Sequence, residues 1–272
     1  MPSTPQFAAP AALTIAGFDP SSGAGITADL AVFAAHGIFG TSAITALTVQ
    51  STAGVQRVQP IEADVLADTL KCLQDDLPPA GVKIGMLGGA AQVSAVAEYL
   101  SSLPRDLPVV LDPVLQSTSG VALLSDEGRN ELLKNLLPRV TVVTPNAIEL
   151  SILTGASCET EAEIQAAARR LAGLYPGLTV LCTGGDRPRP NDFLLYEDSW
   201  TVLPGAHIAS RATHGTGCAL SSALLCGLLS ELEMHDAAVE AKAYVTRAIV
   251  QATPRGSGKG PMNLLWPLVE RT

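Results

Sequence analysis

Arg211-Ala-Thr-His-Gly-Thr-Gly-Cys218 is followed at once by a run of small and apolar residues that ends at Leu229. Gly215 and Gly217 allow a tight turn whose N–H groups come close to a ligand, and Thr216 or Gly217 can begin the helix that follows. The N-terminus of a helix carries about half a positive charge and several unpaired N–H donors, so it stabilises a phosphate or a transferring phosphoryl group. The stretch therefore predicts an anion site at the start of a helix.

Three side chains of this stretch are candidates for chemistry. Cys218 lies in the first helical turn, where the helix dipole would lower the pKa of its thiol and make it a proton acceptor or a polar anchor. The alternative is an inert core cysteine after a glycine-rich turn. The Arg211 guanidinium could face the transferring phosphate, or could form a surface salt bridge. His214 is interpreted as a structural residue of the turn.

Length and composition set the class of protein. The chain has 272 residues, of which 47% are hydrophobic and 4% aromatic, enough to bury a large aliphatic core in one α/β domain. A formal net charge of −9, without any basic run, argues against a nucleic-acid partner. Five cysteines without a CxxC pair indicate neither a disulfide framework nor a zinc site, which favours the cytoplasm.

Neither the N-terminal residues nor the hydropathy of the chain predicts a targeting or membrane segment. Residues 1–10 have neither a basic region nor an apolar segment and are predicted to form a flexible tail. No stretch reaches the roughly 20 apolar residues that span a bilayer, so no membrane partner is expected. Residues 11–272 contain no linker or repeat, and we interpret them as a single domain, for which we expect a homodimer.

Short β-rich runs alternate with helical patterns, which predicts a central, mostly parallel sheet with helices on both faces. The expected strands are 13–16, 38–49, 55–58, 82–86, 109–112, 141–144 and 179–183. A peripheral hairpin is expected over 192–197 and 200–203. The expected helices run from the loop at 18–25 to about residue 36, and over 62–75, 90–102, 217–231 and 235–252.

Polar side chains stand where these strands end, which is where open α/β sheets bind ligands. The residues are Asp19, Gln50, Met86, Asp112, Asn146 and Thr183. Asp112, which precedes a proline, could hold Mg²⁺ together with phosphate oxygens, or could only begin a turn.

Two further strand ends have alternative interpretations. Asn146 and Glu149 have the spacing of a capping box, and either residue could equally belong to a network of metal and water. The loop 183–186 could be a turn, or its amides, including that of Gly185, could hold nucleotide phosphates. Neither a P-loop nor a GxGxxG motif after the first strand is present, which argues against the best-known nucleotide sites.

Six segments together resemble the hydroxymethylpyrimidine/phosphomethylpyrimidine kinases of thiamine biosynthesis, in that family's order and over nearly the whole chain. They are Ala16-Gly-Phe-Asp-Pro-Ser-Ser-Gly-Ala-Gly-Ile-Thr-Ala-Asp29, Ile44-Thr-Ala-Leu-Thr-Val-Gln50, Lys83-Ile-Gly-Met-Leu87, Val110-Leu-Asp-Pro-Val114, Thr144-Pro-Asn146 and Thr213-His-Gly-Thr-Gly-Cys218. The resemblance implies a ribokinase-like α/β fold, ATP and Mg²⁺. It also implies ATP-dependent phosphorylation of 4-amino-5-hydroxymethyl-2-methylpyrimidine and then of its monophosphate.

The resemblance also implies roles for individual residues. Those that would surround the pyrimidine are Gly17, Ala24, Asp29, Gln50, Met86 and Val114. The catalytic group would comprise Gly215, Thr216 and Gly217 as the anion hole, with Cys218 where sugar kinases carry an aspartate. We expect the nucleotide at Asn146, Thr183, Gly185 and Arg211, and the metal at Asp112 and Glu149.

Three positions depart from the family pattern. Ser22 replaces a usual glycine, and Thr118 and Thr183 stand where lysines are common, which puts the efficiency of the second phosphorylation in question. Two other functions stay open. One is a pyridoxal kinase of vitamin B6 salvage, and the other is a catalytically silent pyrimidine-binding protein.

Overall fold

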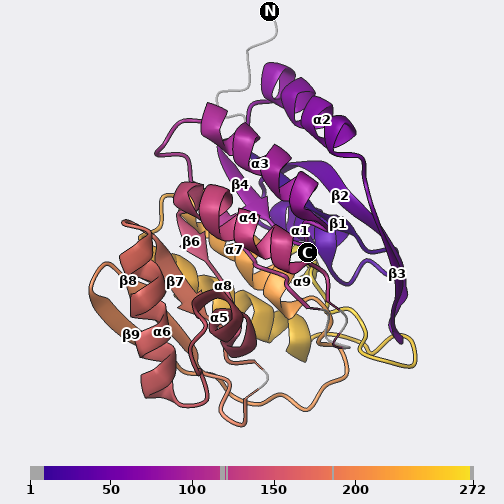
Figure 1. The fold of residues 1–272 in the computed structure, drawn as a ribbon. Coiled ribbons are helices and arrows are strands. Elements are labelled where there is room, and N and C mark those ends of the chain that lie inside the picture. The colour runs from indigo at the N-terminus through magenta and orange to yellow at the C-terminus, as the bar shows by residue number, and fades with distance from the viewer. Residues whose placement is uncertain (1–8, 117–119, 121, 186, 270–272) are drawn as a thin grey trace, which may run out of the picture.

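The computed structural model describes residues 9–116, 120, 122–185 and 187–269, and a nine-stranded sheet runs through them in the order β3-β2-β1-β4-β5-β6-β7-β8-β9 (Figure 1). The strands from β2 to β7 pair in parallel, whereas β3, β8 and β9 are added antiparallel at the edges. The predicted sheet and peripheral hairpin are confirmed. The bounds are β1 Ala11–Phe18, β2 Phe39–Ser51, β3 Gly54–Pro60, β4 Gly81–Ile84, β5 Val109–Leu111, β6 Val142–Val143, β7 Thr179–Cys182, β8 Asp192–Tyr196 and β9 Ser199–Leu203.

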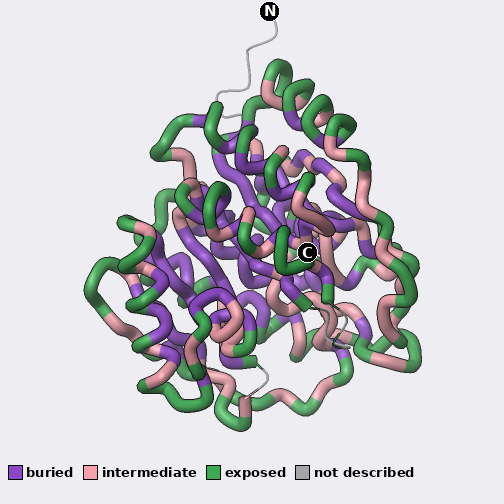
Figure 2. Tube along the Cα trace, viewed as in Figure 1, coloured by how far each residue is buried: buried purple, intermediate pink, exposed green. Residues whose placement is uncertain are grey.

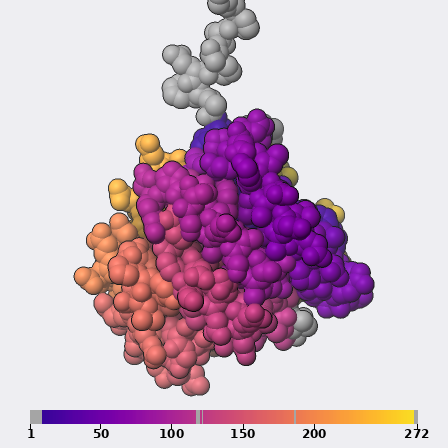
Figure 3. Space-filling view, turned by 45° about the horizontal axis from the view of Figure 1, so that its top comes forward, coloured from indigo at the N-terminus to yellow at the C-terminus, as the bar shows by residue number. Residues whose placement is uncertain are grey.

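Helices cover both faces of the sheet. One layer contains α2 to α6 and the other contains α1, α7 and α8 (Figure 1). In the space-filling view the β2–β3 region lies at one side of the molecule and the orange β8–β9 hairpin at the other, as the strand order requires (Figure 3). The helices are α1 Gly25–Ala35, α2 Ala63–Asp76, α3 Ala90–Ser102, α4 Asp126–Glu131, α5 Ala147–Thr154, α6 Glu161–Leu174, α7 Thr216–Leu229, α8 Met234–Val250 and α9 Trp266–Val269, with a π-helical turn at Leu132–Leu136 and a 3₁₀ turn at Leu137–Arg139.

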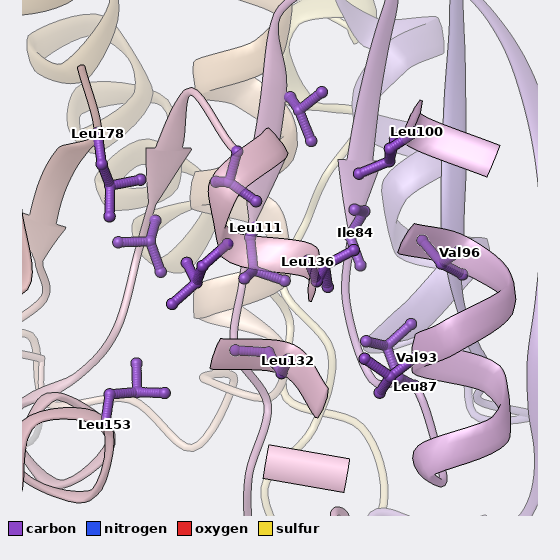
Figure 4. Close-up of a cluster of buried hydrophobic side chains, with 14 of the residues drawn as sticks. Ile84, Leu87, Val93, Val96, Leu100, Leu111, Leu132, Leu136, Leu153 and Leu178 are labelled. Atoms are coloured by element: carbon purple, nitrogen blue, oxygen red, sulfur yellow. The ribbon is translucent and has the colours of Figure 1, made fainter. Parts of the chain in front are cut away.

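The central strand β5 is apolar on both faces because helices cover both of them. Along β5, Val109 and Leu111 pack under the layer of α2 to α6, while Val110 packs under α7 and α8. This is the alternation of a pleated strand, with hydrophobic residues required at every position. Figure 2 shows the buried strands between partly exposed helices, and Figure 4 shows part of the first cluster, with Ile84 and Leu111 opposite Val96 and Leu136.

Three of the described helices were not predicted from the sequence, namely α4, α6 and the short α9. α4 begins after Ser125, whose hydroxyl accepts from the Gly128 N–H, and α6 begins after Thr160 with a complete capping box to Glu163. Both caps are readable in the sequence. Residues 1–8 of the predicted tail, and Thr118, lie outside the described residues. Among the described helices, none is long and apolar enough to cross a membrane.

A buried ion pair joins the layer of α1 and α7 to the sheet. The Lys83 ammonium on β4 donates to both oxygens of Asp29 on α1, at 2.9 and 2.8 Å, and neither side chain has any exposed surface. The same carboxylate accepts from the hydroxyls of Thr14 on β1, at 2.6 Å, and Ser222 on α7, at 2.8 Å. Four elements are therefore tied together by one fully satisfied polar cluster.

We expect Lys83→Met to lower the free energy of unfolding by about 3–5 kcal/mol, because it leaves the Asp29 carboxylate buried without its cation. Lys71→Met is the matched control, since Lys71 is 74% exposed in its pair with Asp75, and it should leave the urea midpoint nearly unchanged. Adding Asp29→Leu to Lys83→Met should recover much of the loss. Equal urea midpoints for the Lys83 and Lys71 variants would contradict the structural role of the pair.

Candidate active site

The ends of parallel strands bring the predicted polar residues to one edge. β1, β4 and β5 are neighbours and end at Phe18, Ile84 and Leu111. Beyond β5 the ladder continues for one step, because the Asp112 N–H donates to the Ile84 carbonyl at 2.8 Å. Asp19, Met86 and Asp112 therefore leave the sheet side by side, as the strand pattern predicted.

Two glycine-bearing loops meet backbone to backbone at this edge. Gly215 has φ +77°, and a β-carbon there would lie 1.9 Å from the carbonyl oxygen of Gly23. Gly25 has φ +60°, and a β-carbon there would lie 2.2 Å from the carbonyl oxygen of Gly17. Only glycine satisfies both the left-handed conformation and the contact. The loop after β1 and the loop before α7 are consequently pressed together.

The start of α7 faces Asp112. The helix begins at Thr216, one of the two predicted starts, with Gly215 as its N-cap, and no described side chain caps it. The first N–H groups of a helix have no partner within the helix, so they can receive an external acceptor. A β-carbon on Gly217 would lie 3.3 Å from Asp112 Oδ2, which places the amide end of α7 directly beside this carboxylate.

The predicted low pKa of Cys218 is wrong. Burial of the thiol raises its pKa to about 12, and the attraction of Lys83 does not offset it. Asp112 and Asp29 also oppose a thiolate, and the Cys218 thiol hydrogen-bonds to the Asp112 carboxylate. The partial charge of a helix end is smaller than these effects together. Cys218 is therefore a neutral thiol.

The surroundings of Asp112 disfavour the charged form of its carboxyl group. Burial raises the pKa of its carboxyl to about 6, and the charge of Asp29 acts in the same direction, although Lys83 and the Cys218 thiol oppose them. A buried carboxylate that is incompletely neutralised attracts a cation. The site thus places the Asp112 carboxylate, whose charge a cation would offset, beside the N–H groups at the start of α7, which could donate to an anion.

His214 links the two glycine loops to β2. Its backbone N–H donates to the Gly260 carbonyl, as a turn residue would, but its ring does more than the sequence indicated. Nε2 lies 2.8 Å from Asp19 Oδ2 and 2.9 Å from the Gln50 side-chain amide. These partners are separated from His214 by 195 and 164 residues, so no local sequence signal could show the link.

The structure shows how serine is accommodated at position 22, where the family pattern has glycine. Its φ is +58°, the left-handed region in which glycine is favoured, and its N–H donates to the Asp19 carbonyl at 3.1 Å. A family glycine at this position would satisfy the same turn without a side chain. Ser22 is exposed, so its side chain fits beside the loop.

The residues predicted for the nucleotide follow β6 and β7, apart from Arg211. Asn146 and Glu149 form the capping box of α5, with Oδ1 and Oε2 each accepting a backbone N–H from the other residue. The backbone of Thr183 pairs with Asn146, and Gly185 is exposed just beyond. The Arg211 side chain is exposed, and its carbonyl accepts from the Gly260 N–H.

Asp29 departs from its predicted place at the substrate. It has no exposed surface, and both its oxygens are occupied by Thr14, Lys83 and Ser222, so it supports the site from beneath. The other predicted substrate residues remain at the edge and partly exposed, except for the buried Gly17. A β-carbon on Gly17 would lie 2.5 Å from the terminal carbon of Met86, which shows how closely these two pack. The partly exposed set is Ala24, Gln50, Met86 and Val114.

A parallel α/β sheet, a glycine-bounded helix start and a buried carboxylate at the strand ends together define an enzyme that handles a phosphorylated ligand. The class they indicate is a phosphotransferase.

Comparison with known proteins identifies the family. The model of the family described as phosphomethylpyrimidine kinase matches residues 19–263, and the chain belongs to this family. It is therefore a kinase. The hydroxymethylpyrimidine/phosphomethylpyrimidine kinase of Synechococcus elongatus is 39% identical over 266 residues, which are 96% of this chain and 99% of that protein.

Solved structures agree with the fold. The crystal structure of phosphomethylpyrimidine kinase from Clostridium difficile is 34% identical, with a TM-score of 0.77, over 88% of this chain and 99% of that one. The pyridoxal kinase of Staphylococcus aureus in complex with ADP is 28% identical, with a TM-score of 0.87, over 95% of this chain and 94% of that one. The ribokinase-like fold predicted from the resemblance is confirmed, and the ADP complex of this relative supports the use of ATP.

The pKa of Asp112 predicts how stability depends on pH. Its folded pKa of about 6 exceeds the ordinary 3.8, so the folded state binds the proton more tightly than the unfolded state. Stability from this group is complete below about pH 4 and is lost as pH rises through about 6, at a cost of about 3 kcal/mol. Asp112→Asn should remove the cost, so the ligand-free variant should be more stable than wild type at pH 8 and equal to it near pH 4.

The measurement is the free energy of unfolding in urea at both pH values. Asp68→Asn, at an exposed position of α2, is the control and should follow wild type at both. An Asp112→Asn protein that is less stable than wild type at pH 8 would show that the carboxylate is already neutralised in the fold.

Proposed function

We propose that the chain transfers the γ-phosphoryl group of ATP to the hydroxymethyl oxygen of 4-amino-5-hydroxymethyl-2-methylpyrimidine, and then to the resulting monophosphate, in thiamine biosynthesis. The observation that carries the proposal is the meeting of the start of α7 with Asp112, which sets an anion site beside a cation site at the edge where Gln50 stands. The names of the curated relatives support the same substrates.

The amides of Gly215, Thr216 and Gly217 would stabilise the transferring phosphoryl group. Phosphoryl transfer passes through a loose transition state, so alignment and charge stabilisation contribute most of the rate enhancement. Backbone donors held rigidly by the contact of Gly215 with Gly23 need no reorganisation during the reaction. Ala24, Met86 and Val114, with Gly17 beneath them, would surround the pyrimidine.

Asp112 has the chemistry that Mg²⁺ requires. It is a hard oxygen donor, Gly217 leaves space beside Oδ2, and the raised pKa of its carboxyl reflects a negative charge that a cation would offset. Bound Mg²⁺ would supply charge neutralisation of the phosphate oxygens. Glu149, whose Oε2 caps α5, would contact the metal through water. Asn146, Thr183, Gly185 and Arg211 would lie on the nucleotide side.

The assembly and the second phosphorylation are also proposals. The exposed apolar side chains Phe39, Leu47 and Val49 of β2 support a homodimer, and the family and the reduced cysteines support the cytoplasm. Thr183 offers a neutral hydroxyl where relatives commonly have lysine, so we propose a slower second phosphorylation than first.

Cys218 would orient the hydroxyl of the substrate, since a neutral thiol bonded to Asp112 is a poor proton acceptor. We expect Cys218→Ala to reduce kcat by roughly five- to 150-fold, because it removes one orienting hydrogen bond, while the melting temperature changes little. Cys72→Ala, at an exposed cysteine of α2, is the matched control and should keep wild-type turnover. Full activity of Cys218→Ala, measured as substrate-dependent ADP release, would exclude the role.

Gln50 would recognise the pyrimidine ring of the substrate through hydrogen bonds. A 4-aminopyrimidine presents a ring-nitrogen acceptor beside an exocyclic N–H donor, and a glutamine amide offers the complementary pair, whereas pyridoxal lacks the amino group. Gln50→Met should lower kcat/KM for hydroxymethylpyrimidine by roughly five- to 150-fold and change pyridoxal turnover little.

The assay also separates the other two functions. Wild type that prefers pyridoxal would be a pyridoxal kinase, and wild type that releases no ADP with either compound would be a silent binding protein. A Gln50→Met protein that loses both activities equally, with a lower melting temperature, would mean that Gln50 only supports the turn after β2.

A further inference from the structure

One ring nitrogen of His214 serves two partners from distant parts of the chain. Nε2 lies 2.8 Å from Asp19 Oδ2, in the loop after β1, and 2.9 Å from the amide of Gln50, at the end of β2. The His214 side chain is 16% exposed and that of Asp19 is 5% exposed. Whether Nε2 carries a proton therefore determines which end of the Gln50 amide, the NH₂ group or the oxygen, faces a ligand.

Asp19 is ionised. Burial raises the pKa of its carboxyl, but hydrogen bonds from His214 and Ser21 outweigh it and hold the pKa below the ordinary value. Oδ1 accepts from the Ser21 N–H and hydroxyl, both at 2.8 Å, and Oδ2 accepts from the Ala24 N–H at 3.0 Å. A carboxylate in this environment only accepts hydrogen bonds.

The proton of His214 is consequently on Nε2, which donates it to Asp19. The structure places Gln50 Nε2 at 2.9 Å from this nitrogen. A nitrogen that carries a proton has no lone pair left for an N–H donor, so we reverse the amide, which brings Oε1 to this place, where it shares the N–H. The two ends of a glutamine amide have nearly the same shape, and the hydrogen-bond network assigns them. The NH₂ group of Gln50 is then directed away from His214.

We propose that Asp19 and His214 are positioning residues that hold the Gln50 amide with its NH₂ group toward the bound ring, and so select a ring with a nitrogen acceptor. The inference rests on the proposed function and deepens it. The NH₂ group donates to the ring nitrogen of an aminopyrimidine. The remaining lone pair of Oε1 accepts from the adjacent exocyclic amine. Without the histidine the side chain changes rotamer as well as reversing its amide, and binding of the ring must order it again.

The test is a double-mutant cycle with His214→Leu and Gln50→Met. His214→Leu should lower kcat/KM for hydroxymethylpyrimidine by about 5- to 30-fold through KM, with kcat and pyridoxal turnover little changed. In the Gln50→Met background the same substitution should change kcat/KM by less than about twofold, because residues that act through one another are not additive. Ser210→Ala, in the same loop, is the control and should match wild type.

A direct measurement complements the cycle. ¹⁵N NMR of the histidines in the ligand-free wild-type protein at pH 8 should show His214 protonated at Nε2 and unprotonated at Nδ1. The Nδ1–H tautomer would overturn the proposal, and so would additive effects in the cycle or equal losses for both substrates. This measurement needs no substitution, so it decides the arrangement even if His214→Leu folds poorly. Absence of hydroxymethylpyrimidine turnover by wild type would instead refute the proposed function.

Discussion

The contact between Gly215 and Gly23 is the constraint on which the site depends. A single methyl group on Gly215 would overlap the Gly23 carbonyl at 1.9 Å, so the two loops can approach only where both backbones are bare. This approach brings together the start of α7, the loop after β1 and the carboxyl end of β5, which the sheet alone would leave as separate loops. Because backbone atoms make the contact, the path of both loops does not depend on a side-chain rotamer.

Buried charge is concentrated beneath that contact. Lys83 and Asp29 form a satisfied pair, whereas Asp112 is left with a raised pKa and Cys218 with a proton that it does not release at neutral pH. The fold tolerates one uncompensated carboxylate at the place where a cation would be needed. Stability and function are opposed there, which is a common property of active sites. The cost is local because the Lys83–Asp29 pair is complete.

The strand ends and the helix start could be predicted because they depend on local patterns. Short apolar runs followed by polar residues identified the edge, and glycine spacing identified the start of α7. The pKa of Cys218 could not be predicted, since it depends on burial and on Asp112, more than a hundred residues away. The predicted place of Asp29 beside the substrate was wrong for the same reason. Its partners come from three other elements, and only the packed fold shows that they occupy it. α6 was readable from its capping box and was missed.

An acidic protein that binds a polyanion must obtain its attraction locally. With a net charge of −9 the long-range field repels a nucleotide, and the Lys83 ammonium, which is buried beneath the site, is already paired with Asp29. Besides the exposed Arg211, the attraction would come from short-range groups: the oriented amides of α7, and a carboxylate suited to a divalent cation. Both act over short distances, so they attract a phosphate only after it has entered the site. A site built in this way discriminates by geometry more than by charge.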